Sequence, residues 1–458
     1  MHRYIGDRSF YRRVFAVLIP ILIQQVITTF VSLLDNIMVG QIGTEPMSGV
    51  AIVNQLMFVF NLCLLGGISG AGILTAQFYG KGDLEGIRQS IRMKLFIAVG
   101  IFVVFGSVLL FFGDFFVGLF LHEGESGLDL EATAGYAREY MDVIMLQLLP
   151  FALTMMYSGT LRETGETVVP MKAGLAAVGV NLVFNYILIF GKFGAPKLGV
   201  VGAALATVLA RVVELSTLIV WTHRHTERNP FIVGVYRSLR VPKQVVLQVF
   251  RLGLPLMMNE LLWSGGMTVL NQCYSLRGLE VVSAMNISTT VSNLFFSAFI
   301  STGNATAIMV GQLLGAGELE RAVDEDRKLI AFALGLSFLI AGLTAATSPF
   351  VPRLYNTIPH VRKLATDILL ITAAAMPLHA FANSCYFTLR SGGKTVITFL
   401  FDSGVLWLVS VPTAFLVSRL TAMPILPMIA LIEGINLVKC AIGYFMVKQR
   451  HWVVNLVA

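Results

Sequence analysis

Long runs of apolar residues recur along the whole of this 458-residue chain. Each run is about 20 residues long, the length that an α-helix needs to cross the hydrocarbon core of a bilayer. Charged residues make up only 13% of the chain, too few to cover the surface of a water-soluble protein of this size. We therefore expect an all-α integral membrane protein. Twelve transmembrane helices are predicted, near residues 14–36, 47–76, 91–113, 136–158, 171–191, 199–222, 247–271, 281–311, 329–351, 364–387, 396–418 and 422–447.

Basic residues fall in short segments between these runs. The formal net charge is +7, but the Lys and Arg residues do not collect on one tail or one face, which argues against a nucleic-acid partner. The side of the membrane that holds both termini carries 23 of them and the opposite side eight. The positive-inside rule then places both termini in the cytoplasm. We expect a multi-pass protein of the cell (inner) membrane.

An internal repeat relates the two halves of the chain. A shift of 235 residues superposes Gln77-Phe-Tyr-Gly80-Lys-Gly82 on Gln312-Leu-Leu-Gly315-Ala-Gly317. Six helices separate equivalent positions, and an even number returns the chain to the same side of the membrane, so the halves are parallel. Parallel duplications are typical of secondary transporters, whose substrate path lies at the junction of the two bundles and which work by alternating access. We expect six-helix lobes at 1–222 and 247–458, joined by a cytoplasmic linker at 223–246.

Polar and ionisable side chains inside the predicted helices are functional candidates, because a charge in hydrocarbon is costly unless it faces water or a partner. Asp35 ends the first helix. Asn181 and Asn185 lie four residues apart, on one face of the fifth helix, and Thr207 lies in the sixth. If these helices meet, one carboxylate and three neutral donors form a site for Na⁺, a hard cation, or for a proton. The alternative is that Asp35 is an interfacial carboxylate at the outer end of its helix.

Several stretches resemble the multidrug and toxic compound extrusion (MATE) family. They are Leu161-Arg-Glu-Thr-Gly-Glu-Thr167 with Pro170, the segments 181–191 and 199–207, Leu33-Leu-Asp35-Asn-Ile-Met-Val-Gly40, and the loop from Gln77 to Glu85. The resemblance covers nearly the whole chain. It implies a twelve-helix, two-lobed antiporter that exports organic cations or drugs in exchange for Na⁺ or H⁺.

The resemblance also implies that Asp35, Asn181, Asn185 and Thr207 form the cation site of the first lobe. The chain departs from the family at Asn185, where many prokaryotic members have Asp. The missing carboxylate is expected to weaken cation binding or proton storage at that site.

The second lobe offers two further carboxylates. By resemblance, a glutamate of the seventh helix often serves coupling or substrate binding, although it usually lies about one turn further from the proline than Glu260 does. In the internal repeat Glu260 falls on Gln25, so the shared scaffold does not require a carboxylate there, which favours a functional role. Asp402 is expected either to face the transport path or to pair with Arg390 or Lys394.

His379 and Trp263 complete the candidates for substrate binding or coupling. His379 is a candidate because histidine is the side chain best suited to exchange a proton at physiological pH, and its alternative role is that of a hydrogen-bonded packing residue. Trp263, with Tyr274 and nearby methionines (Met257, Met258 and Met285), is expected to line a cavity that accepts large cations through cation–π contacts. The alternative is that each of these side chains packs in the protein or faces lipid.

Other intramembrane charges are expected to be structural. Arg211 and Glu214 are three residues apart in one helix and are predicted to neutralise each other. Glu433 and Lys439 are six apart, too far for a pair on one face, so we expect one or both to have a partner on another helix.

The sequence also bears on two other function classes. A flippase for a lipid-linked or amphiphilic substrate on the same superfamily scaffold would favour a cationic cavity, whereas Asp35, Glu260 and Asp402 are acidic. A membrane-embedded enzyme is not supported, because the sequence contains no metalloprotease, nucleophile-elbow or P-loop motif. The four cysteines lie in apolar stretches without a zinc spacing. We expect no cofactor, a monomer in the lipid membrane, and small organic cations or amphiphilic drugs as ligands.

Overall fold

The computed structural model describes residues 4–121, 129–355 and 357–458. In these ranges twelve helical spans are long and apolar enough to cross a membrane, which confirms the predicted count. The first six are α1 (Arg8–Gly40), α2 (Thr44–Lys81), α3 (Leu84–Gly118), α4 with α5 (Leu130–Ile144 and Leu148–Glu163), α6 (Val168–Phe190) and α7 (Val200–Arg224). The other six are α8 (Lys243–Ser275), α9 (Leu279–Gly315), α10 (Leu319–Thr347), α11 (Pro359–Ser391), α12 with α13 (Thr395–Phe399 and Val411–Leu420) and α14 (Ile425–Lys448).

Several helices extend beyond the apolar runs that predicted them. The run at 14–36, for example, is the centre of a helix from Arg8 to Gly40. Helical backbone hydrogen bonds continue into the polar interface, where hydropathy no longer marks them, and capping side chains set the true ends. Asp83 does so at α3, where its carboxylate accepts a hydrogen bond of 2.9 Å from the backbone N–H of Gly86.

The eleventh span is not a uniform α-helix. Between α12 and α13 lie two π-helical segments, η4 (Leu400–Gly404) and η5 (Leu406–Ser410). A π-helical turn holds more residues than an α-helical turn, so it changes which side chains share a face. Asp402 lies in η4.

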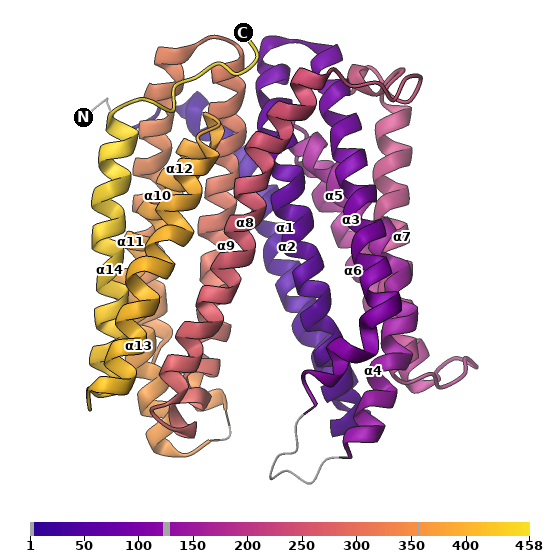
Figure 1. The fold of residues 1–458 in the computed structure, drawn as a ribbon, viewed down its shortest axis with the longest axis vertical. Helices are drawn as coiled ribbons and strands as arrows, with labels where there is room; N and C mark the ends of the chain where they lie inside the picture. The colour runs from indigo at the N-terminus through magenta and orange to yellow at the C-terminus, as the bar shows by residue number, and fades with distance from the viewer. Residues whose placement is uncertain (1–3, 122–128, 356) are drawn as a thin grey trace. The chain divides into compact units, whose positions relative to one another are not determined.

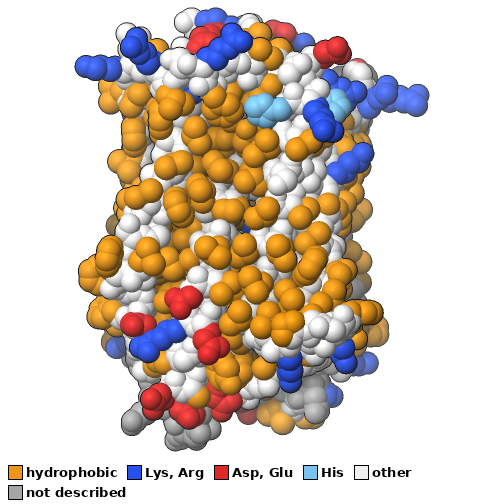
Figure 2. All heavy atoms as spheres, turned by 90° about the vertical axis from the view of Figure 1, so that its right-hand side faces the viewer, with side chains coloured by type: hydrophobic (Ala, Val, Ile, Leu, Met, Phe, Trp, Pro, Cys, Tyr) orange, Lys and Arg blue, Asp and Glu red, His pale blue; other side chains and the backbone are white. Residues whose placement is uncertain are grey.

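Large apolar side chains cover the outside of the helices. On α3, Leu110 and Phe111 are 73% and 81% exposed. Figure 2 shows one face of the molecule, where hydrophobic side chains form a broad band and charged side chains gather towards the two ends. Such a surface is stable in lipid rather than in water. The chain is therefore a multi-pass membrane protein.

The chain divides into two compact units. The first-half unit contains Ile23–Thr75 and Asp83–Gly253, and the second-half unit contains the residues up to Leu22, Ala76–Gly82 and Leu254–Ala458. These boundaries differ from the expected lobes at 1–222 and 247–458. One end of α1 and one end of α2 belong with the second half, because each of these long helices has its contacts in both units.

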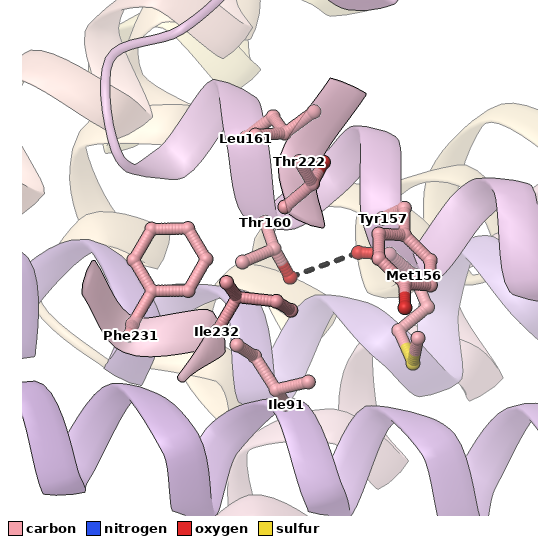
Figure 3. A pocket seen from close by; sticks show the side chains of 8 residues that line it. All are labelled: Ile91, Met156, Tyr157, Thr160, Leu161, Thr222, Phe231 and Ile232. Carbon is pink, nitrogen blue, oxygen red and sulfur yellow. Dashed lines mark hydrogen bonds between the residues drawn. The ribbon is translucent and has the colours of Figure 1, made fainter. Parts of the chain in front are cut away.

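The segment 223–246, expected as a linker between the lobes, is folded against the first-half unit. Arg92 of α3 donates from Nε to the carbonyl of Val235 at 2.9 Å, and a short 3₁₀ helix, η2 (Pro230–Ile232), packs its side chains inward. Figure 3 shows Phe231 and Ile232 closing a small cavity against α3, α5 and α7. The cavity is about 10 Å³, room for about one water molecule, so it is a packing feature rather than a binding site.

In the second-half unit α11 packs against α9, α10 and α14, and these helices lie side by side in Figure 1. The repeated motif lies at one end of this unit. A side chain at Gly80 would overlap the backbone carbonyl of Gln312, and one at Gly315 would overlap that of Gln77. The two copies of the motif therefore contact each other reciprocally, and only glycine allows the two backbones to approach so closely.

Candidate functional site

Two helices in the first-half unit position the predicted cation-binding residues. Asn181 and Asn185 lie one turn apart on α6 and are 5% and 1% exposed. Small residues bring α7 close to α6: a Cβ on Gly202 would lie 2.6 Å from the carbonyl oxygen of Leu188. This close packing lets Thr207 of α7 reach the asparagines.

Asp35 meets these side chains from α1. Asn185 Nδ2 donates to Asp35 Oδ1 at 2.6 Å and contacts Asn181 Oδ1 at 3.2 Å. Asn181 Nδ2 lies 3.3 Å from Thr207 Oγ1. If the amide of Asn181 is turned over, its Nδ2 donates to Asp35 Oδ1 at 2.8 Å and its Oδ1 accepts from Thr207. In both orientations the structure brings together the four residues that the sequence nominated.

Asp35 has neutral partners and no basic one. Among the described residues it forms no ion pair within 4 Å. Arg211 lines the same cavity as Asp35, but its guanidinium group forms an ion pair with Glu214 at 2.7 Å. The predicted pairing of Arg211 with Glu214 is therefore confirmed. The direct contacts of Asp35 are therefore hydrogen bonds from neutral groups, and Arg211 acts on its charge only from a longer distance.

These four residues form the Asp35 cluster (Asp35, Asn181, Asn185 and Thr207). The cluster borders a cavity of about 330 Å³ within the first-half unit. Asp35, Asn185, Thr207 and Arg211 all line it. The rest of the wall includes further polar side chains that the sequence analysis did not nominate: Asn36, Asn54, Asn61, Tyr140 and Gln147. A signal for two of them exists in the sequence, because Asn54 and Asn61 are amides seven residues apart, and therefore on one face, in an otherwise apolar helix.

One buried polar atom in the cluster lacks a partner. Asn185 Oδ1 is buried and makes no hydrogen bond in the part of the chain that the structure describes. An unsatisfied carbonyl oxygen beside a carboxylate is costly to bury, and a hard cation binds such oxygens. The donor set around Asp35 thus fits a monovalent cation, with Asp35 supplying the charge and the amide and hydroxyl groups supplying neutral oxygens.

Asp402 has a different environment in the second-half unit. Its Oδ1 forms an ion pair with Lys439 of α14, and its Oδ2 accepts from Asn259 Nδ2 at 3.1 Å. Neither Arg390 nor Lys394 is its partner, which corrects the expected pairing. The π-helical turn around Asp402 directs the carboxylate towards α8 and α14 instead.

Glu260 lies one residue from Asn259, near the same carboxylate. It forms a hydrogen bond with Tyr386 and interacts with the positive charge of Arg390 and the negative charge of Asp402. Arg390 is therefore associated with Glu260. The second-half unit thus places Asp402 and Glu260 near two bases, Lys439 and Arg390.

The remaining candidates, His379 and Trp263, line neither of the two cavities described above. His379 Nε2 lies 2.7 Å from a carboxylate oxygen of Glu433, and its ring packs edge-on against Phe296. Glu433 and Lys439 thus each have a partner on another helix, as expected. Trp263 is 41% exposed, whereas Tyr274 belongs to the apolar core.

A buried ion pair in the first-half unit was missed by the sequence analysis. Lys94 of α3 is fully buried and contacts both Glu163 and Thr160 of α5, the latter at 3.0 Å. Its position among the interfacial basic residues gave no sign of burial.

No group of three or more His, Cys, Asp or Glu side chains that could hold a metal ion occurs in residues 4–121, 129–355 and 357–458. All four cysteines are free thiols; Cys273 and Cys385 are buried, and Cys63 and Cys440 are partly buried. The candidate chemistry is therefore that of carboxylates, amides and hydroxyls.

Comparison with known proteins finds similarity along most of the chain. The family model described as MatE matches residues 20–187 and 255–416, which together make up more than half of the sequence. The chain is 26% identical over 427 residues to the probable multidrug resistance protein YoeA of Bacillus subtilis, covering 91% of this chain and 89% of that protein. It is 25% identical over 405 residues to the probable multidrug resistance protein NorM of Thermotoga maritima, with 88% and 84% covered.

The fold has a close structural counterpart. The outward-facing structure of a multidrug resistance MATE family transporter of the MOP superfamily matches with a TM-score of 0.87. The match covers 98% of this chain and 97% of that one, at 20% sequence identity. At this level of identity the similarity concerns the fold.

Proposed function

Because the chain belongs to the multidrug and toxic compound extrusion (MATE) family of transporters, and is thus not an enzyme, we propose that it is a secondary antiporter. It exports organic cations or amphiphilic drugs and takes up Na⁺ or H⁺ in exchange. The coupling cation binds at the Asp35 cluster. The names of the relatives, which are multidrug resistance proteins, support the substrate class.

The observation that supports this proposal is the environment of the Asp35 carboxylate. The carboxylate lies in a membrane-spanning helix, borders a cavity of about 330 Å³, and is held only by neutral groups. An uncompensated carboxylate in a membrane needs a cation or a proton. Asp35 therefore has both the need for a cation and a polar cavity through which one reaches it.

The substrate occupies the same cavity in this proposal. Asp35 supplies a negative charge for an organic cation, and the surrounding amides and Tyr140 offer hydrogen bonds. Because one carboxylate serves both ligands, the cation and the substrate compete for it. Such competition gives exchange of one ligand for the other, which is antiport.

Efflux from proteoliposomes tests the proposal. The purified protein is reconstituted, loaded with a fluorescent organic cation, and given a Na⁺ gradient or a pH gradient in separate experiments. We expect one of the gradients to drive efflux from wild-type vesicles and Asp35→Asn to abolish that efflux. Asp114→Asn is the matched control, because Asp114 is an exposed aspartate of α3 paired with Arg138.

Wild-type efflux rates in the Asp35→Asn protein would refute the assignment. Movement of a lipid-linked compound without dependence on either gradient would favour the flippase alternative.

We also infer that both termini face the cytoplasm in the cell membrane. The inference is supported by the excess of Lys and Arg on that side of the predicted topology, 23 against eight. Cysteines introduced near the C-terminus should then react with a membrane-impermeant maleimide only after the cells are opened. Equal labelling of intact cells would place the terminus outside.

A further inference from the structure

A lysine and an aspartate form an ion pair within the membrane-spanning part of the second-half unit. Lys439 Nζ contacts Asp402 Oδ1. Asp402 lies seven residues after the start of its span and Lys439 nine residues before the end of α14, so each is roughly 10 to 14 Å along its helix. Their side chains are only 16% and 17% exposed. Both charges are therefore inside their spans rather than at the helix ends.

Asn259 fixes the position of the carboxylate. It is 2% exposed, and its Oδ1 accepts hydrogen bonds from Ser403 Oγ at 2.7 Å and from the backbone N–H of Ser403 at 3.3 Å. This leaves Nδ2 to donate to Asp402 Oδ2. Each carboxylate oxygen of Asp402 thus has a defined partner, one neutral and one cationic.

The ammonium group is equally well placed. Besides Asp402, Lys439 Nζ lies over the ring of Phe401, 5.4 Å from its centroid, where the negative face of the ring attracts it. Glu260 and Arg390 lie near this pair and offset each other. The formal charges of these four side chains sum to zero.

Asp35 in the first-half unit and Asp402 in the second-half unit therefore have opposite electrostatic environments. Asp35 is surrounded by amides and a hydroxyl and lacks a basic partner among the described residues, whereas Asp402 has an ammonium group bound to it. A lysine ammonium carries the same charge as Na⁺ or a proton, but it cannot leave the protein.

We propose that Lys439 is a tethered cation that occupies the position at Asp402 where an exchangeable monovalent cation would otherwise bind. Asp402 consequently takes no part in cation exchange. In the transport cycle the exchangeable cation binds at Asp35 and not at Asp402. Only this last statement rests on the proposed function. The ligand that the site would accept without the lysine is a monovalent cation, either Na⁺ or a proton.

Removal of the tethered charge tests the proposal. In Lys439→Met the carboxylate keeps Asn259 but loses its counter-charge, and a carboxylate in the membrane then requires another cation. We expect the purified full-length variant to bind about one more monovalent cation per protein than wild type. Binding of radioactive sodium identifies the cation as Na⁺, and proton uptake measured in weakly buffered solution identifies it as H⁺. Lys448→Met, at the exposed end of the same helix, is the matched control and should bind as wild type does.

The double variant Asp402→Asn/Lys439→Met keeps the test decisive if the single variant does not fold. It lacks both charges and should bind the same number of cations as wild type. A smaller number would show that Asp402 binds an exchangeable cation in the wild-type protein, and a folded Lys439→Met protein without extra cation would likewise overturn the proposal.

Failure of the proposed function has a separate signature. Adding Asp35→Asn to each background should remove one bound cation. If it removes none, the Asp35 assignment fails, while the difference between Lys439→Met and wild type still decides the role of the lysine.

Discussion

Replacement of Asn185 by aspartate is expected to tighten cation binding at the Asp35 cluster. Asn185 Nδ2 lies 2.6 Å from Asp35 Oδ1, and its own Oδ1 is the buried oxygen without a partner. Asn185→Asp exchanges the amide for a carboxylate of nearly the same shape. The site then contains two adjacent negative charges instead of one.

The size of the effect follows from this geometry. A cation bound between the two side chains would lie within about 4 Å of the new carboxylate, and at an effective dielectric constant of about 20 the attraction is about 4 kcal/mol. This would correspond to a gain in affinity of roughly 1000-fold. The cation-free variant relieves the repulsion between its carboxylates by taking up a proton, which offsets part of that gain. We therefore expect a measured gain of about 10- to 100-fold at neutral pH.

Equilibrium binding of radioactive sodium to the purified protein measures this gain, and proteoliposome efflux shows whether transport follows. Asn61→Asp is the matched control, because Asn61 lines the same cavity but is not part of the hydrogen-bonded cluster. It adds the same charge without a direct ligand and should change the affinity much less. An unchanged or weaker affinity in Asn185→Asp, or an equal gain in Asn61→Asp, would refute the assigned geometry.

Three further predictions concern stability and can be checked on the purified protein in detergent. Gly80→Ala places a methyl group against a backbone carbonyl of α9 and should cost about 1–3 kcal/mol, seen as a lower Tm, whereas Gly342→Ala has open space and should be neutral or stabilising. Lys94→Met removes the ammonium group from this buried ion pair with α5 and should cost about 3–5 kcal/mol, so a Tm within a degree or so of wild type would contradict it. A hydrogen bond from the backbone N–H of Phe10 lowers the pKa of Asp7, which caps α1 outside the membrane, so this cap stabilises the folded state at neutral pH and is lost as the pH falls through the folded-state pKa. Amide hydrogen exchange in the first turn of α1 should be slower in the wild type than in Asp7→Asn at neutral pH, and this difference should shrink at acidic pH; no pH dependence of the difference would exclude the cap.

The Asp35 cluster shows how far sequence reasoning reached. The sequence analysis selected four residues because polar side chains are costly in apolar helices unless they have a function. The structure connects all four through hydrogen bonds: Asp35, Asn181, Asn185 and Thr207. The cavity beside them was not predicted. Its wall includes Tyr140, whose functional neighbourhood depends on how α4 packs.

The second-half carboxylates show where that reasoning fails. One of the two roles expected for Asp402 was a pairing with Arg390 or Lys394, which are close in sequence, yet the partner is Lys439 of another helix. An α-helical periodicity does not describe the π-helical turn that carries Asp402. Nearness along the chain was therefore a poor guide to which charges meet.

The amino-acid sequence alone determined the class of the protein: its twelve spans, its internal repeat and its family. These properties depend on the length, composition and order of local segments, which can be read without knowing how the segments pack. The tertiary structure decided which helix faces meet, and hence that Asp35 is held by neutral groups while Asp402 is bound to a lysine. The physical reason is that the cost of a charge in a membrane depends on its neighbours in space, and those neighbours come from helices far apart in the chain.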